Sequence, residues 1–569
     1  MNIKKQFFAP FLFVLLIILS GGLIFYFQIT KSPLDETAFF FSIKELKVIA
    51  GGINDILFQV ILGIAILIAC YILLSKFFKR FILPKTYLTL FYTSSFLTLL
   101  FVKYLFLPSE NRTKEVYSSN RLVYFIAKSN AYFENKTSTN TILISPSDFE
   151  ELSSNVFPDG CTNKQYPLLH PLNQKSIFST KFKIQKDKKL PNIVFIVVES
   201  LSSDFIGNHA DQTGNVMPFL DSLSNYSLYF PNFISTCHRT FNVLPASLAS
   251  VPNSTDGAIT TTNDFTPQMS LQMLLNSSYK TRFYCGVDLS FTNMNGYMNN
   301  LGTNYLVNKW NKKYDIPFSK RSNPWGYPDG YIFSKSWEDF RNQKLSYKPR
   351  FDVFLTISTH DPFVFPKESY YLKKAAELGK SKKIPKTLFK QLYSNPYLMA
   401  SFAYTDDALK SYFERAKKMP EFENTIFFIY GDHGTPLYSR TPLSRYNVPL
   451  VVYSPLLKKP EQIKSVNSHL DLAPTLLNFL KTNYGFKFPS DVTFIGKEFE
   501  MGNKFTSNRT MALLSMSGKN ESFLDQNQIL LQNQLFKILP DLKVKKVKSK
   551  NKTKHLQKQI RLYDLMSKY

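Results

Sequence analysis

The sequence predicts an α/β domain, built on a largely parallel sheet flanked by helices and preceded by about three transmembrane helices. Residues 192–198 and 425–430 are runs of β-branched and aromatic residues without polar alternation, as in strands buried on both faces of a parallel sheet. From residue 191 to about residue 540, strand-like and helix-like segments alternate, which is typical of sheets covered by helices on both faces. Before residue 108, three apolar runs are long enough to cross a bilayer.

The apolar runs cover approximately residues 8–29, 53–74 and 87–107. Residues 76–85 carry four basic residues and no acidic one, so the positive-inside rule places them and the N-terminus in the cytoplasm. We therefore expect residues 1–107 to be the transmembrane region of a multi-pass protein of the plasma or inner membrane, with an extracytoplasmic catalytic domain. A cleaved signal peptide and buried soluble helices are the alternatives, and the lengths of the runs disfavour both.

Two other segments have a biased composition. Residues 108–190 are polar, and we expect an extracytoplasmic linker in which residues 122–133 form a helix, either on the membrane surface or packed within the linker. Residues 541–569 are expected to be a basic C-terminal tail, with nine Lys and one Arg between residues 543 and 568 against Asp564 alone. Such a run is usually solvated, and the alternative is adhesion to anionic lipid.

The whole chain has a formal net charge of +27, which indicates anionic partners such as membrane head groups or phosphorylated substrates. No nucleic acid is expected, because no nucleic-acid-binding motif accompanies the charge. The four cysteines, Cys70, Cys161, Cys237 and Cys285, lack CxxC spacing, so a thiol metal site is not expected. A disulfide among the last three stays open.

The catalytic domain is expected at residues 191–540. Its further strands are predicted at 282–286, 351–358 and 448–453, and its helices at 218–225, 267–276, 397–418 and 469–480. The strand at 192–198 ends on Glu199, and the strand at 425–430 is followed by Asp432 and His433. Because ligands bind beyond the carboxyl ends of parallel strands, these three side chains predict a metal site. The simpler interpretation is a helix cap at Glu199 and a turn at Asp432.

A nucleophile is expected in residues 235–248, Ser-Thr-Cys-His-Arg-Thr-Phe-Asn-Val-Leu-Pro-Ala-Ser-Leu. This segment has the pattern of a turn that enters a helix, where backbone N–H groups and the helix dipole favour an anionic phosphate. A hydroxyl bound there to a divalent cation can lose its proton near neutral pH and attack phosphorus.

Seven motifs in fixed order then resemble a known family. They are Asn192-Ile193-Val194 through Glu199-Ser200, Arg239-Thr240, Asp288 with Phe291-Thr292-Asn293, Ser358 to Phe363, Tyr404-Thr405-Asp406, Gly431 to Gly434, and Asp471 to Leu477. The set resembles the lipoteichoic acid synthase and phosphoglycerol transferase branch of the sulfatase-like alkaline phosphatase superfamily, over about residues 190–500. Any one motif alone would be weak, and their order makes the resemblance specific.

The resemblance implies roles for individual residues. The metal ligands fall on Glu199, Thr240, Asp432 and His433, and Thr240 is also the covalent nucleophile. Three further residues would contact the substrate: His360, Arg239 and Asp288. For His360 a loop-anchoring role is the alternative, and for Arg239 a plain surface charge.

The metal implied is Mn²⁺, with Zn²⁺ or Mg²⁺ possible from the same ligand types. The implied enzyme is membrane-anchored and moves a phosphoglycerol-type group from a phospholipid donor to an extracytoplasmic glycan or lipid acceptor through a phosphothreonine intermediate. A phosphoethanolamine transferase, a phosphodiesterase or sulfatase-like hydrolase, and a non-catalytic scaffold are the alternatives.

The sequence departs from this superfamily's patterns at two places. Cys237 to Phe241 lacks the C-x-P-x-R context in which sulfatases form formylglycine, which disfavours a sulfatase. Thr292 and Met294 stand where lipoteichoic acid synthases carry a Trp and an Arg that contact glycerophosphate, so we expect single transfers rather than polymer synthesis. The motif at 471–477 is expected to be structural, and His469 to be a surface histidine rather than a residue that supports the metal site.

Overall fold

The computed structural model describes most of residues 168–566 and a few residues before them. Described are 19–24, 72, 121–122, 124–126, 129, and 168–566 except 173–175, 252–268, 288, 290–293, 308–325, 343–347, 382–383, 385, 436–439, 516–519 and 532. The three predicted spans and the linker lie almost wholly outside these residues. Among the described residues, no helix combines the length and the apolar character needed to cross a membrane. The chain divides into two compact units, residues 1–142 and 143–569, and all elements below belong to the second.

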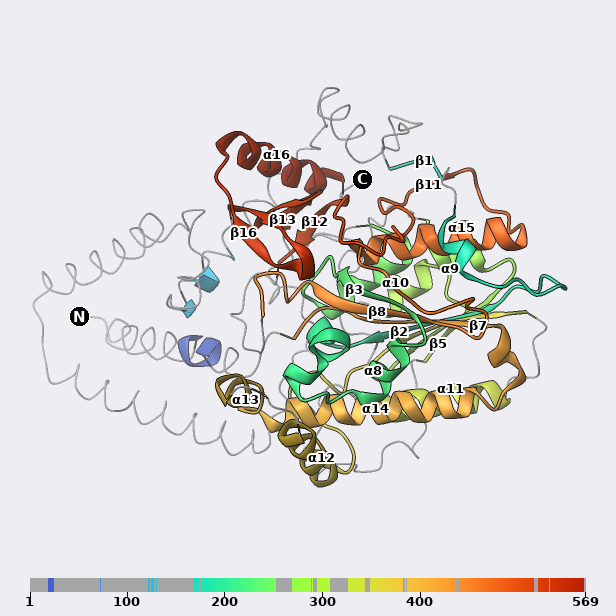
Figure 1. The fold of residues 1–569 in the computed structure, drawn as a ribbon, viewed down its shortest axis with the longest axis horizontal. Helices are drawn as coiled ribbons and strands as arrows, with labels where there is room; N and C mark the ends of the chain where they lie inside the picture. Colours follow the sequence, from blue (N-terminus) through green and yellow to red (C-terminus); the bar gives the residue numbers. More distant parts are fainter. Residues whose placement is uncertain are drawn as a thin grey trace, which may run out of the picture. The chain divides into compact units, whose positions relative to one another are not determined.

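A nine-stranded sheet forms the centre of this unit (Figure 1). In spatial order its strands are β10 (Asn467–Ser468), β3 (Leu228–Ile234), β8 (Asn447–Tyr453), β7 (Thr425–Gly431), β2 (Asn192–Val198), β6 (Arg350–Leu355), β4 (Lys280–Cys285) and β5 (Tyr305–Leu306), with β9 (Glu461–Gln462) beside β3. All five strands expected from the sequence are present, and β2 lies between β6 and β7 with both pairings parallel. Ile193 to Val198 are fully buried, as the uninterrupted apolar run predicts.

The sheet is mixed rather than uniformly parallel. β8 runs antiparallel to β7 and to β3, while every other pairing among the described strands of this sheet is parallel. The reason lies in the connection, because the described part of the chain between β7 and β8 contains no helix. A parallel neighbour needs a crossover, whereas an antiparallel neighbour can be reached by a loop.

Helices cover both faces of this sheet, as predicted (Figure 1). On one side lie α8 (Pro218–Ser224), α11 (Asp329–Asn342) and α14 (Pro396–Ala416), with α12 (Glu368–Ser381) and α13 (Lys386–Leu392) beyond, and on the other lie α9 (Leu271–Leu275), α10 (Met294–Asn300) and α15 (Leu472–Tyr484). α14 begins where Asn395 caps the N–H of Tyr397 and Pro396 fills the first helical position. Helix α9 is shorter than predicted.

The C-terminal segment forms a second sheet, and the expectation of a solvated tail after residue 540 is wrong. The sheet is an antiparallel meander of β12 (Thr510–Leu514), β13 (Asn520–Asp525), β14 (Gln528–Leu531), β15 (Gln534–Ile538) and β16 (Val544–Lys546), followed by α16 (Lys550–Met566). In α16, Leu556 and Tyr563 are fully buried, and the Tyr563 ring packs edge-on against Phe523 of β13. The burial of these side chains orders the segment despite its charge. A short antiparallel pair, β1 (His170–Pro171) with β11 (Asp491–Val492), completes the unit.

Candidate active site

Glu199 directly follows the carboxyl end of β2 and is almost completely buried. Two threonines after β6 hold its backbone: the Glu199 N–H donates to Thr356 Oγ1 at 3.0 Å, and Thr359 Oγ1 donates to the Glu199 carbonyl at 2.5 Å. The Ser200 hydroxyl donates to Glu199 Oε1 at 2.8 Å. The loop that follows a neighbouring parallel strand therefore holds the Glu199 backbone, and Ser200 orients its carboxylate.

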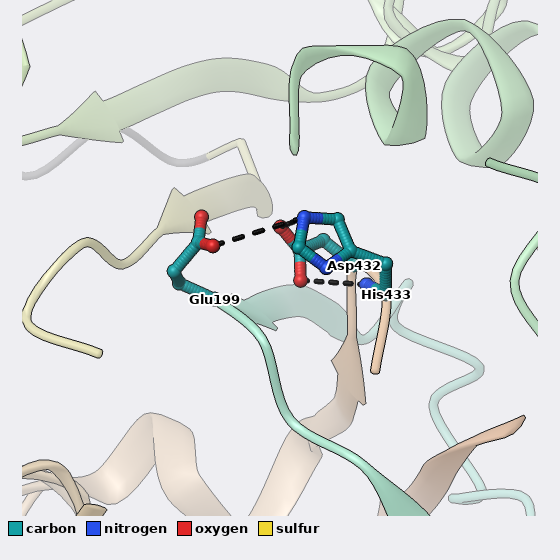
Figure 2. A group of neighbouring side chains, drawn as sticks. All are labelled: Glu199, Asp432 and His433. Atoms are coloured by element: carbon teal, nitrogen blue, oxygen red, sulfur yellow. Dashed lines mark hydrogen bonds and ion pairs between the residues drawn. The ribbon is translucent and has the colours of Figure 1, made fainter. Parts of the chain in front are cut away.

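Asp432 and His433 follow β7 and lie beside Glu199, as Figure 2 shows. One ligand atom from each of the three residues lies within 4.8 Å of the others. Asp432 Oδ1 accepts the N–H of Ser200 at 2.7 Å and the N–H of His433 at 2.6 Å. Asp432 Oδ2 is buried with no hydrogen-bond partner in the described structure, and His433 Nε2 lies 3.4 Å from it.

Thr240 brings its hydroxyl to the same place. It begins a single 3₁₀ turn, Thr240–Asn242, and its Oγ1 donates to Glu199 Oε2 at 2.7 Å and lies 3.5 Å from His433 Nε2. The helix expected after it is present but irregular: it begins as this 3₁₀ turn, continues through Val243 and Leu244, and ends as a short π-helix, Pro245–Ala249. The π-helix begins at Pro245, which has no N–H to donate to an α-helical hydrogen bond. The structure thus brings together all four side chains that the sequence motifs assign to the metal.

The electrostatics of this cluster favour a bound cation. Burial and the neighbouring Asp432 raise the pKa of Glu199, burial raises the pKa of Asp432 to about 7, and burial lowers the pKa of His433. Two carboxylates are thus buried together with a neutral imidazole and an oxygen that lacks a partner. Such an arrangement is costly unless a positive charge balances it. Carboxylate, imidazole and hydroxyl donors suit Mn²⁺, Mg²⁺ or Zn²⁺, so the residues fit a divalent cation.

The expected substrate residues have different outcomes. His360 follows β6, and its Nδ1 lies 2.7 Å from the Asp361 carbonyl, as a loop anchor would. A positive charge on its ring would lower the pKa of both Glu199 and His433. Arg239 is half-buried directly before Thr240. Asp288 lies outside the described residues, as does Thr292.

Two residues near the departures from the family can be placed. Met294 begins α10 with its side chain buried in the core, away from solvent. Arg282, which could have replaced a missing arginine, instead makes a bidentate pair with Asp352 at 2.6 and 2.8 Å in the amino-terminal halves of β4 and β6. Asp352 lies opposite Val194 of β2, five residues before Glu199, so Arg282 is committed to this pair and not to a phosphate at the site.

Sequence reasoning missed Asp329, the fully buried first residue of α11. Its Oδ1 accepts the N–H groups of Ile357 and Ser358 at 2.8 and 3.0 Å, and its Oδ2 accepts the hydroxyl of Thr405 at 2.7 Å. Burial raises the pKa of this carboxyl. Asp329 thereby fixes the loop between β6 and His360. The sequence signal that could have pointed to Asp329 was its partner Thr405, which belongs to the 404–406 motif. Asp406 of the same motif caps α8.

Two other expectations concern residues close to the site. His469 is fully buried, so its assignment to the surface is wrong: it donates from Nε2 to the Gly431 carbonyl at 2.8 Å, and burial lowers its pKa to about 3. It therefore supports the residue before Asp432. The 471–477 motif is structural, as expected, since Asp471 and Ser468 form a capping box at the 3₁₀ turn His469–Asp471, which leads directly into α15. Cys237 and Cys285 are buried free thiols, and burial raises the pKa of Cys237 to about 12.

Comparison with known proteins now identifies the family, since the sulfatase family profile matches residues 191–482. The chain belongs to the sulfatase family. The protein "Lipoteichoic acid synthase-like YvgJ" of Bacillus subtilis is 21% identical over 379 residues, which cover 62% of this chain and 55% of that protein. The lipoteichoic acid synthase of Staphylococcus aureus is 27% identical over 261 residues, which cover 43% of this chain and 36% of that protein. The chain thus spans about half the length, or less, of these relatives.

A solved structure supports the same fold. An alkaline phosphatase superfamily protein from Vibrio parahaemolyticus superposes with a TM-score of 0.51 at 19% identity, covering 74% of this chain and 94% of that chain. The fold expected from the motifs, alkaline phosphatase/sulfatase-like, is therefore confirmed. The chain is an enzyme of the sulfatase and alkaline phosphatase superfamily, whose members depend on divalent metals, and it has relatives named lipoteichoic acid synthase.

Proposed function

We propose that this protein is a membrane-anchored, metal-dependent transferase that moves a phosphoglycerol-type group from a phospholipid to an extracytoplasmic glycan or lipid. The observation that carries the proposal is the hydrogen bond from the Thr240 hydroxyl to the buried Glu199 carboxylate, at the cluster completed by Asp432 and His433. A hydroxyl held against a buried acceptor is the arrangement of an activated nucleophile. The relatives named lipoteichoic acid synthase favour phosphoglycerol as the transferred group.

Mn²⁺ is the metal we propose, held by Glu199, Thr240, Asp432 and His433. When bound, it would supply positive charge that stabilises the nucleophile and the phosphoryl oxygens. The four side chains offer only oxygen and imidazole nitrogen, which exclude a preference for soft thiolate-seeking metals. Mg²⁺ and Zn²⁺ fit the same donors, and metal analysis of the purified protein distinguishes the three.

The chemistry proceeds in two displacements. Thr240 Oγ1 attacks the phosphorus of the donor while its proton leaves towards Glu199 Oε2, which already accepts that hydrogen bond. The bond from phosphorus to the diacylglycerol oxygen breaks, and His360 protonates that oxygen. The oxygen of an acceptor hydroxyl then attacks phosphorus and gives its proton to His360. The bond to Thr240 Oγ1 breaks, and Thr240 Oγ1 takes back the proton that Glu199 accepted. Arg239 and Asp288 are proposed to hold the phosphate and the head group.

A hydrolase is the second candidate, because water in place of the acceptor would release the group from Thr240 as a phosphodiesterase does. A sulfatase is disfavoured by the buried Cys237, whose pKa is raised and whose sequence context lacks the formylglycine pattern. The burial of Met294 gives no phosphate clamp at that position, so we expect single-unit transfer, of phosphoglycerol or of a related group such as phosphoethanolamine.

Mass spectrometry of the peptide that contains Thr240 tests this proposal. The full chain is incubated with phosphatidylglycerol vesicles and Mn²⁺, quenched in acid and digested. A glycerophosphate adduct on Thr240 is expected, and the same treatment of Thr240→Ala should give none. A phosphoethanolamine adduct from mixed lipids would change the group, and glycerol phosphate release without any acceptor would favour the hydrolase. Long glycerophosphate polymers would contradict single transfer.

The location outside the cytoplasm is also a proposal, resting on the basic residues 76–85. Ser549, exposed before α16, can be replaced by cysteine in a Cys161→Ser background, which removes the cysteine of the predicted linker. Cys237 and Cys285 are buried and should not compete for reagent. An impermeant thiol reagent should label Ser549→Cys on intact cells. Labelling that begins only after lysis would show that the catalytic unit faces the cytoplasm.

A further inference from the structure

The C-terminal sheet and α16 carry basic side chains that their own packing does not use. On α16, Lys550, Lys554 and Lys558 follow one another at four-residue spacing, and Arg561 comes three residues later. All four are exposed, while Leu556 and Tyr563 on the other side of the helix are buried. The spacing places the basic side chains on one stripe of the helix, directed away from the sheet.

A second like-charge arrangement lies in the strands. Lys537 of β15 is directly opposite Lys545 of β16, and both are exposed. The same cross-strand row continues through Gln528 to Asp525, which pairs with Lys552 of α16. Since side chains alternate between the two faces of a sheet, Lys537 and Lys545 project from the face that carries α16.

Both arrangements cost stability. Like charges at four-residue spacing on a helix repel, and like charges directly opposite in a sheet do the same. Of these residues, Lys537, Lys545, Lys550, Lys554 and Arg561 take part in no ion pair within the described structure. In contrast, Lys552, on the inner side of the helix, is paired with Asp525. The lysine that faces the sheet is thus neutralised by an ion pair, whereas the basic residues on the outer side of the helix and on the strands are not.

We propose that this surface, the basic stripe of α16 with Lys537 and Lys545, docks on an anionic lipid surface. A helix with a buried apolar side and an exposed lysine stripe has no apolar face left for insertion, so the attraction is electrostatic and depends on headgroup charge. A bilayer is the favoured occupant because the stripe extends along a whole helix and repeats on adjacent strands, which suits a broad charged plane. The net charge of +27 adds attraction at longer range.

Amine acylation followed by mass spectrometry tests this surface directly. Flotation with vesicles would not, because the apolar runs near the N-terminus would bind any lipid. The full chain, as Thr240→Ala with a chelator present, is reconstituted with phosphatidylcholine alone or with phosphatidylserine added, a head group that is not the proposed donor. These conditions make the result independent of the proposed catalysis.

Acylation of Lys545 and Lys554 should slow by roughly fivefold in phosphatidylserine vesicles. Attraction to an anionic surface raises the occupancy of the docked state by about that factor for each basic residue, and a docked lysine is protected from the reagent. Lys417 and Lys418, exposed at the end of α14, are the internal control and should react equally in both vesicles. The protection should disappear at about 1 M salt, where the Debye length falls to about 3 Å.

A variant completes the test. Lys550→Gln, Lys554→Gln and Arg561→Gln together keep helix-forming residues, so the fold should hold, and protection of Lys545 should fall to near zero. The control variant Lys417→Gln with Lys418→Gln should keep full protection. Equal acylation in both vesicles, protection that survives high salt, or protection by soluble polyphosphate but not by vesicles would each overturn the proposal.

Discussion

The nine-stranded sheet buries charged side chains in two regions, one in the amino-terminal halves of its strands and one at their carboxyl ends. In only one of the two do opposite charges pair with each other. In the amino-terminal halves of β4 and β6, Arg282 donates two hydrogen bonds to Asp352, and Arg350 Nε lies 3.1 Å from the same carboxylate. At the carboxyl ends of β2 and β7, Glu199 and Asp432 are buried beside a histidine whose pKa is lowered, and Asp432 Oδ2 has no hydrogen-bond partner among the described groups.

The difference separates a structural charge cluster from a functional one. A buried ion pair joined by two hydrogen bonds, as between Arg282 and Asp352, holds neighbouring strands together without a bound ligand. Buried carboxylates without a balancing cation are maintained at a cost, and such costs accumulate at sites that bind or react. Breaking each cluster in turn should therefore affect different measurements.

The largest effect is expected on the rate of transfer. Thr240→Ala removes the attacking oxygen, so turnover should fall by about 10⁴-fold or more, as for other covalent nucleophiles. The free energy of unfolding should change by no more than about 1–2 kcal/mol, because the side chain is half-buried at the site. Thr240→Ser, which keeps a hydroxyl, should retain part of the activity. Full turnover in Thr240→Ala would move the assignment to another hydroxyl, such as Ser235 or Thr236.

The next largest effect is expected in the other region, on stability. Asp352→Ala leaves Arg282 and Arg350 buried without their partner, which should lower the free energy of unfolding by about 3–5 kcal/mol. Metal affinity and turnover per folded molecule should be unchanged. Lys410→Ala is the control, since its ion pair with Glu414 is exposed and should be worth less than about 1 kcal/mol. Equal losses in the two variants would mean that the buried pair has no special role.

A smaller effect is expected on metal affinity when the ligands are replaced, and activity should fall together with metal occupancy. Glu199→Gln, Asp432→Asn and His433→Ala should each lower metal affinity by at least about 100-fold, the upper end of the effect of losing an outer partner. In chelator, Asp432→Asn should be no less stable than the native chain, because it removes a buried charge. Elemental analysis and titration measure the first effect and chemical unfolding the second. Full metal occupancy in all three variants would refute the ligand assignment.

The sequence predicted those strands, helices and ligands whose local residue pattern is clear. β2 and β7 are apolar without interruption, so their positions and the ligands after them were predictable. β3 was missed because Pro231 and Asn232 interrupt it, and the register shift between Phe230 and Phe233 accommodates them. α16 was missed because its many lysines indicate a solvated segment, and only a few apolar residues indicate that it packs.

Side-chain networks between distant segments could not be predicted at all. Asp329 follows a proline and precedes a glycine, a pattern typical of a turn. Its partners are far away in the sequence: Ile357 lies in the loop after β6 and Thr405 in α14. His469 was assigned to the surface because a single histidine carries no periodic signal. Only the packing of α15 against the sheet shows it bonded to Gly431 beneath the site.

The smallest effect tests whether Asp329 positions the loop that carries His360. Asp329→Asn keeps an oxygen for the N–H groups of Ile357 and Ser358 and alters the contact with Thr405, so the loop should shift without unfolding. We expect kcat to fall by about tenfold, as for residues that orient catalytic groups, with metal affinity unchanged.

Asp406→Asn is a matched control for this last variant. Asp406 is also buried and also accepts two backbone N–H groups, those of Phe219 and Leu220, but these belong to α8 and not to the loop of His360. If burial of a carboxylate were all that mattered, the two variants would lower stability and kcat alike. If Asp329 acts through the loop, only Asp329→Asn lowers kcat, while both change the free energy of unfolding by similar amounts, about 1–2 kcal/mol. An unchanged kcat in Asp329→Asn would remove the positioning role and leave the carboxylate a purely structural one.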